Sequence, residues 1–345
     1  MHIERLTLHG LYAVLRLGLL AVERMTQPNK TLEAWLELPL TDIDRASLRS
    51  ACGESRTRMG GYYRLYAEKK LISSALRRSD GASLLRLARS LDTTDYSEFS
   101  FRLQDGQGVV IALPHYGHYV VTAINLMEHF RERRDIYMLY GSPEHHPGNA
   151  LFDALSGILF GDATCRAKRL HADSRGLATA VRALKAGATL ITMRDVCPDE
   201  QHAYVIPFLK RQLEIPLGTA SLARRSGASL IPAISRHEGP LRFSTLFGKG
   251  VSTGLPADRA DRADRALAQA SDYGATLKMF EFFETIMAEN PTHWQYALGH
   301  YASRSPFPVM DPSDVEPTWR CIRDVNPILR APPVAIELAC QEQCQ

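Results

Sequence analysis

The chain has 345 residues, of which 45% are hydrophobic and 23% are charged, and this composition excludes general disorder. Its 41 Lys and Arg against 38 Asp and Glu leave a net charge of +3, too small to indicate nucleic-acid binding. The six cysteines lack the paired spacing of a zinc site and fit a reducing compartment.

Residues 1–95 are expected to form an N-terminal helical segment. The turn and cap signals "TQPNKT", "LPLTDID" and "RSDGAS" separate stretches that suit helices. An apolar stretch at residues 11–22 is too short to span a bilayer and is interrupted by Arg16. It also lacks a signal-peptide cleavage site. We expect this stretch to pack against the core, with binding to a membrane surface as the alternative.

Residues 96–305 change to the alternating pattern of an α/β domain. The segment "SRGLATAVRALKAG" predicts a helix with Ser174 as its cap and Gly187 as its stop, and it leads into the strand "ATLITM". This alternation predicts a mainly parallel central sheet flanked by helices. Residues 306–345 are Pro-rich and are expected to form a C-terminal tail. Short runs rich in Val, Ile and Leu recur at 109–113, 136–140, 189–193, 203–208 and 229–234.

The stretch "GVVIALPHYGHYVV" places His115 where a predicted strand ends. Functional groups of an open α/β sheet gather beyond the carboxyl ends of its strands. A histidine at this position can accept a proton from a nucleophile. The backbone N–H groups around Gly117 and His118 are expected to face the negative charge that develops. The alternative is a histidine that only caps a helix or binds a buried carbonyl.

The same stretch resembles the strand and catalytic histidine motif of the lipid A late acyltransferases, the lauroyl/myristoyl branch of the lysophospholipid acyltransferase superfamily. Downstream, "GLATAVRALKAGATLITMRDVCPDEQHAYVIPFLKRQLEIPLGTASLARRSGASLIPAISR" and "ENPTHWQYALGHYASR" are similar to later elements of that family, in the same order. The resemblance spans about residues 95–304. It implies transfer of an acyl group from an activated (thio)ester donor to a hydroxyl or amine, with His115 as general base.

The family's acid, five residues after the histidine, is replaced here by Val120. One interpretation is that Asp195, in "TMRDVCPDE", orients His115 instead. A second is that an amine acceptor needs less activation, so that His115 with His118 suffices. A third is that the site has lost its chemistry and the fold binds a ligand without catalysis.

His118 is predicted to share the catalytic pocket, because it follows His115 by three residues in a first helical turn. A surface position is the alternative for this histidine. No metal site is predicted, because no well-spaced third ligand accompanies the two histidines, and no cofactor is expected. By resemblance, Asn149 lies in the acceptor-binding region and Arg166 lies in a phosphate-binding loop. The predicted substrate-binding residues are Tyr116, Gly117, Asn149, Arg166 and Arg194.

The expected partners are an acyl carrier protein, or another activated acyl donor, and a small-molecule or lipid acceptor. An aminoacyl-tRNA donor stays open, whereas specific nucleic-acid binding is not favoured. The resemblance implies a phospholipid or lipid A acceptor as the family default. The missing acid and the weak apolar segment make an acceptor from specialised metabolism the alternative. We expect the protein in the cytoplasm, with peripheral contact at the inner face of the membrane as the second location.

Overall fold

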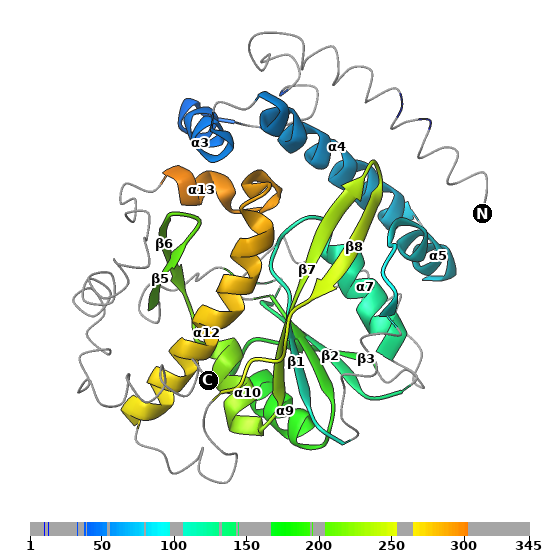
Figure 1. Ribbon diagram of the computed structural model, residues 1–345. Helices are drawn as coiled ribbons and strands as arrows, with labels where there is room; N and C mark the ends of the chain where they lie inside the picture. The colour runs from blue at the N-terminus through cyan, green and yellow to red at the C-terminus, as the bar shows by residue number, and fades with distance from the viewer. Residues whose placement is uncertain are drawn as a thin grey trace.

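The fold is built around one six-stranded sheet with helices on both of its faces (Figure 1). It is seen in a computed structural model of the chain. The structure describes residues 41–53, 56–78, 81–96, 106–130, 133–142, 144, 167–193, 195, 204–253 and 265–302, together with residues 10, 13, 33, 38 and 40.

The sheet is mainly parallel, as the alternating sequence pattern predicts. Its strands follow the spatial order β3-β2-β4-β1-β7-β8. All neighbouring strands are parallel except β7 and β8, which pair antiparallel. The strands are β1 (Val109–Ala112), β2 (Ile136–Tyr140), β3 (Ala167–His171), β4 (Thr189–Thr192), β7 (Ser229–Gly239) and β8 (Arg242–Phe247).

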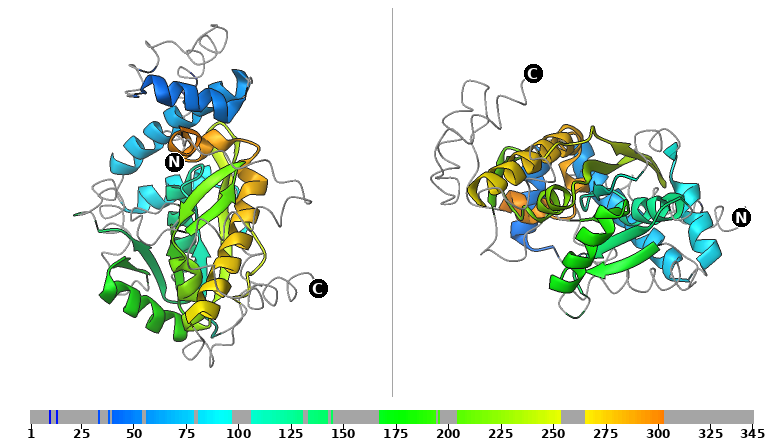
Figure 2. Two further views of the ribbon diagram at one scale, coloured as in Figure 1. Left: turned by 90° about the vertical axis from the view of Figure 1, so that its left-hand side faces the viewer. Right: turned by 90° about the horizontal axis from the view of Figure 1, so that it is seen from below.

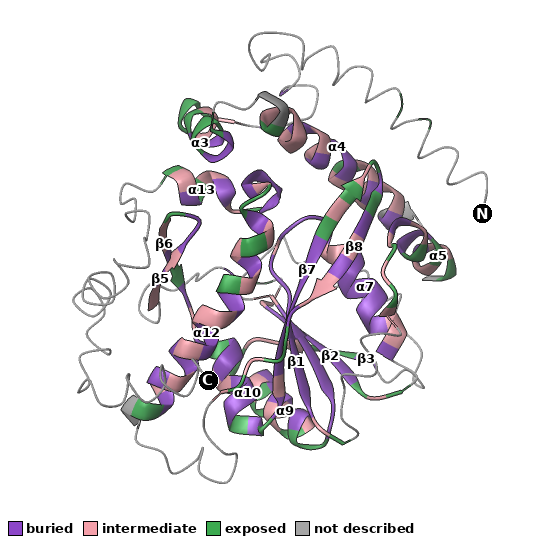
Figure 3. Cartoon of the chain, in the orientation of Figure 1, coloured by how far each residue is buried: buried purple, intermediate pink, exposed green. Residues whose placement is uncertain are grey.

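Helices bury both faces of the sheet, which Figure 2 shows from the side and from below. Along β1, Val110 and Ala112 pack into one core cluster, whereas Val109 and Ile111 pack into the other. Because both faces are covered, β1 and β2 are apolar and buried throughout (Figure 3). One face is covered by α9 (Ser174–Lys185), α10 (Gly218–Ser226) and α12 (Arg265–Met287), and the other by α4 (Arg56–Arg78), α5 (Gly81–Leu91) and α7 (Tyr119–Phe130).

Helix α9 shows how the local sequence sets an element's ends. Its N-cap is Asp173, whose carboxylate accepts the N–H of Gly176 at 2.7 Å. The prediction of Ser174 as the cap is therefore wrong by one residue; a carboxylate at this position also interacts favourably with the helix dipole. The predicted stop is confirmed, since Gly187 follows the helix with φ +86°.

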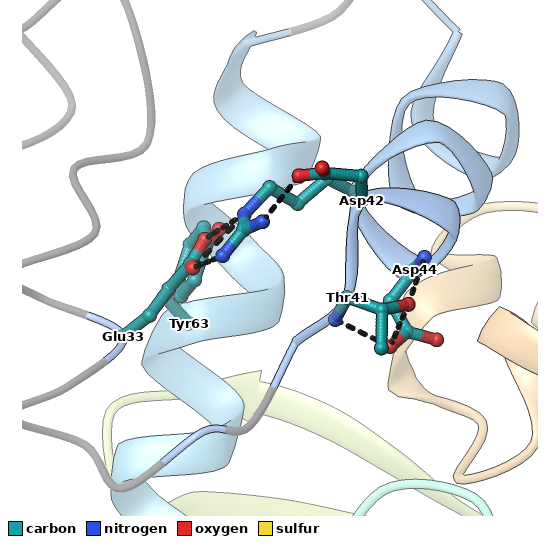
Figure 4. A network of polar contacts seen from close by, with 6 residues as sticks. Glu33, Thr41, Asp42, Asp44 and Tyr63 are labelled. Carbon is teal, nitrogen blue, oxygen red and sulfur yellow. Dashed lines mark hydrogen bonds and ion pairs between the residues drawn. The ribbon is translucent and has the colours of Figure 1, made fainter.

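The N-terminal helical segment is confirmed over its described part. Helix α3 (Asp42–Cys52) begins with a capping box in which Thr41 and Asp44 bind each other's backbone N–H (Figure 4). Arg45 extends from this helix to the buried carboxylate of Glu33, 2.5 Å away, which also accepts the hydroxyl of Tyr63 on α4. Among the described helices, none is both long enough and apolar enough to cross a membrane.

The predicted strand at residues 203–208 does not join the central sheet. It is β5 (Tyr204–Phe208), which forms a separate antiparallel hairpin with β6 (Arg211–Ile215). Leu209 and Lys210 connect the two strands. Both have positive φ, as the type I′ turn of a two-residue hairpin loop requires. After α12, the chain passes through the short helix η3 (Pro291–His293) into α13 (Ala297–Ala302), which lies beside α3.

Candidate active site

The register of the parallel sheet places His115 and Asp195 at the same edge. Ala112, the last residue of β1, pairs with Thr192, the last residue of β4. His115 and Asp195 each follow three residues later, so they leave adjacent strands at the same level. This edge is formed by the carboxyl ends of the strands, where open α/β sheets bind their ligands.

The two side chains contact each other directly. Nδ1 of His115 lies 2.5 Å from Oδ1 of Asp195, and the backbone N–H of His115 donates to Oδ2 at 2.8 Å. The indole N–H of Trp294 donates to the same Oδ2, also at 2.8 Å. The carboxylate is thus held by a ring nitrogen, an amide and an indole, and it fixes the orientation of the imidazole.

Asp195 is kept as a carboxylate although it is 2% exposed. Burial by itself would raise its pKa. The charge interaction with His115 and the hydrogen bonds from His115 and Trp294 outweigh burial, so the pKa of Asp195 lies below its ordinary value. An ionised acid at this position selects the tautomer of His115 that carries its proton on Nδ1.

Nε2 of His115 is left for a reacting group. In the described part of the chain, no residue forms a hydrogen bond with this nitrogen. The imidazole lies between two aromatic rings, those of Tyr119 and Tyr296, with ring centroids 4.9 and 5.2 Å away. Its side chain is 16% exposed. The ring is therefore held on its sides and at Nδ1, while Nε2 has no partner among the described residues.

The segment after η3 pairs with the backbone around His115. Tyr116 and Trp294 form an antiparallel bridge, and the N–H of Gln295 donates to the carbonyl of His115 at 2.9 Å. The side chain of Gln295 accepts the hydroxyl of Tyr119 at 2.8 Å. Trp294 and Gln295, almost 180 positions later in the chain, therefore hold the backbone around His115. Trp294 also binds the carboxylate of Asp195.

The stretch that carries this dyad matches a known family. The profile of the bacterial lipid A biosynthesis acyltransferases matches residues 82–299. The chain belongs to this family. A comparison with curated proteins finds no match. The predicted resemblance is thus confirmed, and acyl transfer is the general activity that the family supports.

This member departs from the acyltransferase pattern at Val120, where the resemblance implies an acid. Val120 is half-buried and packs against the core cluster of the α7 face. The contact between His115 and Asp195 fits the first of the three interpretations, in which another strand end supplies the acid.

The amides expected to face a developing negative charge are already engaged. The N–H of Gly117 donates to the carbonyl of His293 at 3.0 Å, and that of His118 donates to Oγ of Ser235 at 3.1 Å. The prediction that these two groups stabilise an oxyanion is therefore wrong in this structure. Position 117 requires a glycine for a structural reason. Its φ is +57°, and an added Cβ would lie 2.4 Å from the carbonyl oxygen of Ser235.

His118 does not share a pocket with His115. Its side chain is buried, and its Nε2 lies 3.2 Å from Oε2 of Glu68 on α4. The prediction that both histidines face one catalytic pocket is wrong, because they contact different carboxylates, Asp195 and Glu68. Burial lowers the pKa of His118, against the opposing effect of Glu68.

The other predicted substrate contacts fall into two groups. The ring of Tyr116 is 2% exposed within the core, where burial raises its pKa, so this placement does not support a contact with substrate. Asn149, Arg166 and Arg194 lie outside the described residues. Their predicted roles in this acyltransferase stay predictions.

Sequence reasoning did not single out Trp294, Tyr119 and Tyr296 as site residues. A signal was present for Trp294, which lies in the "ENPTHWQYALGHYASR" element that resembles the end of the family's pattern. Nothing in the sequence signals Tyr119 and Tyr296, because their place beside His115 depends on the pairing of distant segments.

Proposed function

We propose that this acyltransferase moves an acyl group from a thioester donor to a hydroxyl acceptor, with His115 as general base. The observation that carries the proposal is the contact between Nδ1 of His115 and the buried carboxylate of Asp195. An imidazole held in this way has its basic nitrogen, Nε2, directed away from the acid.

The proposed reaction needs one base and no covalent intermediate. Nε2 of His115 takes the proton of the acceptor hydroxyl as the oxygen attacks the thioester carbonyl. The carbon–sulfur bond breaks, and the imidazolium returns the proton to the leaving thiolate. Asp195 stabilises the imidazolium during this cycle and is not itself protonated.

An alcohol acceptor is favoured over an amine by the presence of the orienting acid. An alcohol must lose its proton to a well-placed base during attack, whereas a neutral amine is already nucleophilic. The buried Asp195 supplies the orientation that the sequence lacks at Val120. We further propose an acyl carrier protein as donor and an acceptor from specialised metabolism, used in the cytoplasm or at the inner face of the membrane.

The proposal is tested with decanoyl-coenzyme A as donor probe and a panel of acceptors. The panel contains a lipid A precursor, long-chain alcohols, amino alcohols and amines, and the readout is thiol release together with mass spectrometry of the product. We expect acceptor-dependent thiol release by the parent protein and loss of about 10³-fold or more in His115→Ala.

A second candidate function is a binding protein that retains the acyltransferase fold without its chemistry. It requires that parent and His115→Ala release thiol at the same background rate with every acceptor. The assay is repeated with acyl carrier protein thioesters, so that a negative result cannot arise from a coenzyme A donor that the protein does not accept. Equal background rates with both donor types would overturn the enzymatic proposal.

A further inference from the structure

A second cluster of ligand-type side chains includes His118, three residues after His115. Glu68 of α4 lies between two histidines: its Oε2 is 3.2 Å from Nε2 of His118 and 3.1 Å from Nε2 of His237. The three ligand atoms all lie within 4.8 Å of one another. We propose that Glu68, His118 and His237 bind a divalent zinc ion.

Three separate elements bring these residues together. Glu68 lies in the middle of α4, His118 directly precedes α7, and His237 lies near the end of β7. β7 is long enough to pass the edge of the sheet: its residue Pro232 already pairs with Ala112, the last residue of β1. Figure 1 shows this extended part of β7 and β8 reaching α4.

The distances suit ligands of one tetrahedral ion. Zinc binds imidazole nitrogen and carboxylate oxygen at about 2.0–2.2 Å, so two such ligands lie about 3.3 Å apart. The two measured separations from Oε2 of Glu68 are 3.2 and 3.1 Å. Both histidines present Nε2, which can bind a metal only as the neutral imidazole. Two histidines and one glutamate also leave a fourth position for water or another group.

The burial of the carboxylate supplies an independent reason for a cation. Glu68 is fully buried, and its Oε1 has no hydrogen-bond partner in the part of the chain that the structure describes. A buried carboxylate with an unsatisfied oxygen is costly unless a positive charge compensates it.

Two further groups accompany the cluster of Glu68, His118 and His237: a buried ring nitrogen of His293 and the ammonium of Lys69. Nδ1 of the buried His293 has no hydrogen-bond partner among the described residues, and the ring centroid of His293 lies 5.5 Å from that of His237. Lys69 follows Glu68 in α4. Its ammonium lies 5.6 Å from the ring centroid of Tyr119, on the side of His115. The ion would thus link α4 to the segment that follows His115. It would bind neither His115 nor Asp195.

The first experiment measures zinc binding by the untagged, full-length protein. The protein is treated with a chelator, dialysed and titrated with zinc chloride by calorimetry, and its thermal unfolding is followed with and without the metal. We expect one zinc ion per chain and an increase in the unfolding temperature, because an ion that binds the folded state stabilises it. Absence of zinc binding would overturn the proposal.

The second experiment compares ligand variants with a matched control. His237→Gln and Glu68→Gln are expected to weaken zinc binding by about 100-fold or more, since even residues that only support metal ligands contribute about 10- to 100-fold. His129→Gln is the control, because His129 lies at the end of α7 and stacks on Tyr96, outside the cluster. Zinc affinity that is unchanged in both ligand variants contradicts the proposed site.

A folding defect in Glu68→Gln would not obscure the result. His237→Gln is then the more informative variant, because the side chain of His237 is 22% exposed and contributes less to the core than that of Glu68. Cobalt(II) bound in place of zinc gives the visible absorption bands of a four-coordinate site with nitrogen and oxygen ligands. These bands are expected in the parent and in His129→Gln and absent in His237→Gln. Bands that persist in His237→Gln would place the metal elsewhere.

Discussion

His115 and Asp195 are each the third residue after a register pair of the central sheet, formed by Ala112 and Thr192. Because parallel neighbours keep a constant offset, the two side chains reach the same level and meet at 2.5 Å. The position where the family's acid is implied, Val120 in the first turn of α7, is apolar here, and the carboxylate that contacts His115 follows the neighbouring strand β4. This relationship gives direct predictions for the two positions.

Asp195→Asn is expected to lower kcat by about 10³- to 10⁴-fold, because an amide facing Nδ1 favours the wrong tautomer of His115. The measurement is thiol release with the decanoyl-coenzyme A probe and the best acceptor. Val120→Glu is the companion variant. It is expected to give no gain in rate, because Nδ1 of His115 is already occupied. Wild-type activity in Asp195→Asn would contradict the assignment of this acid.

Trp294→Phe tests a positioning residue that acts through Asp195. The substitution keeps an aromatic ring but removes the donor to Oδ2, and hydrogen bonds to charged groups contribute about 1.5–3 kcal/mol. We expect kcat to fall about tenfold or more with little change in KM. Loss of this donor raises the pKa of Asp195, so the activity should decline at a higher pH on the acid side than in the parent.

The control for Trp294→Phe is Tyr273→Phe, which removes a buried hydroxyl that donates to the carbonyl of Val205, away from the dyad. This variant is expected to lower stability without moving the pH–rate profile. If Trp294→Phe behaves in the same way, its role is only structural.

Gly117→Ala is expected to destabilise the protein by about 2 kcal/mol or more. The new Cβ would lie 2.4 Å from the carbonyl oxygen of Ser235, and a positive φ by itself costs an L-residue about 1–2 kcal/mol. Gly218→Ala is the matched control, since no atom lies within 4 Å of its Cβ and it begins α10. Thermal unfolding measures both variants. Equal unfolding temperatures would show that the loop accommodates the methyl group.

His300 is expected to make the protein less stable in mild acid. Burial lowers its pKa to about 4, against the opposing hydrogen bond to the carbonyl of Phe208. The unfolded chain, with an ordinary histidine pKa of about 6.5, therefore binds a proton before the folded chain does. Stability contributed by the neutral form is complete above about pH 6.5 and falls as the pH decreases towards 4.

The size of this effect follows from linkage. Between pH 7 and pH 5 the loss is about 2 kcal/mol for one such histidine. His300→Gln removes the titrating group, so its free energy of unfolding should depend less on pH over this interval than that of the parent. Chemical denaturation at several pH values measures the difference. Parallel pH curves for parent and variant would assign the acid sensitivity to other groups.

The sequence determined the class of fold because its signals are local. Continuous apolar runs are typical of strands buried on both faces, and β1 and β2 are such strands, although the run at 203–208 forms a separate hairpin. The stretch around His115 also identified the family and the end of the strand where chemistry is expected. Even the exact ends of helices depend on near neighbours, as Asp173 and Gly187 show for α9.

Only the tertiary structure decided the partners of the histidines. The sequence leaves Asp195 as one of several interpretations, and the register of β1 and β4 places it beside His115. The sequence predicts His118 beside His115, but its side chain contacts Glu68, 50 residues earlier in the chain. Contacts between distant segments depend on how strands pair and how far they extend beyond the sheet, and no local periodicity records these two quantities.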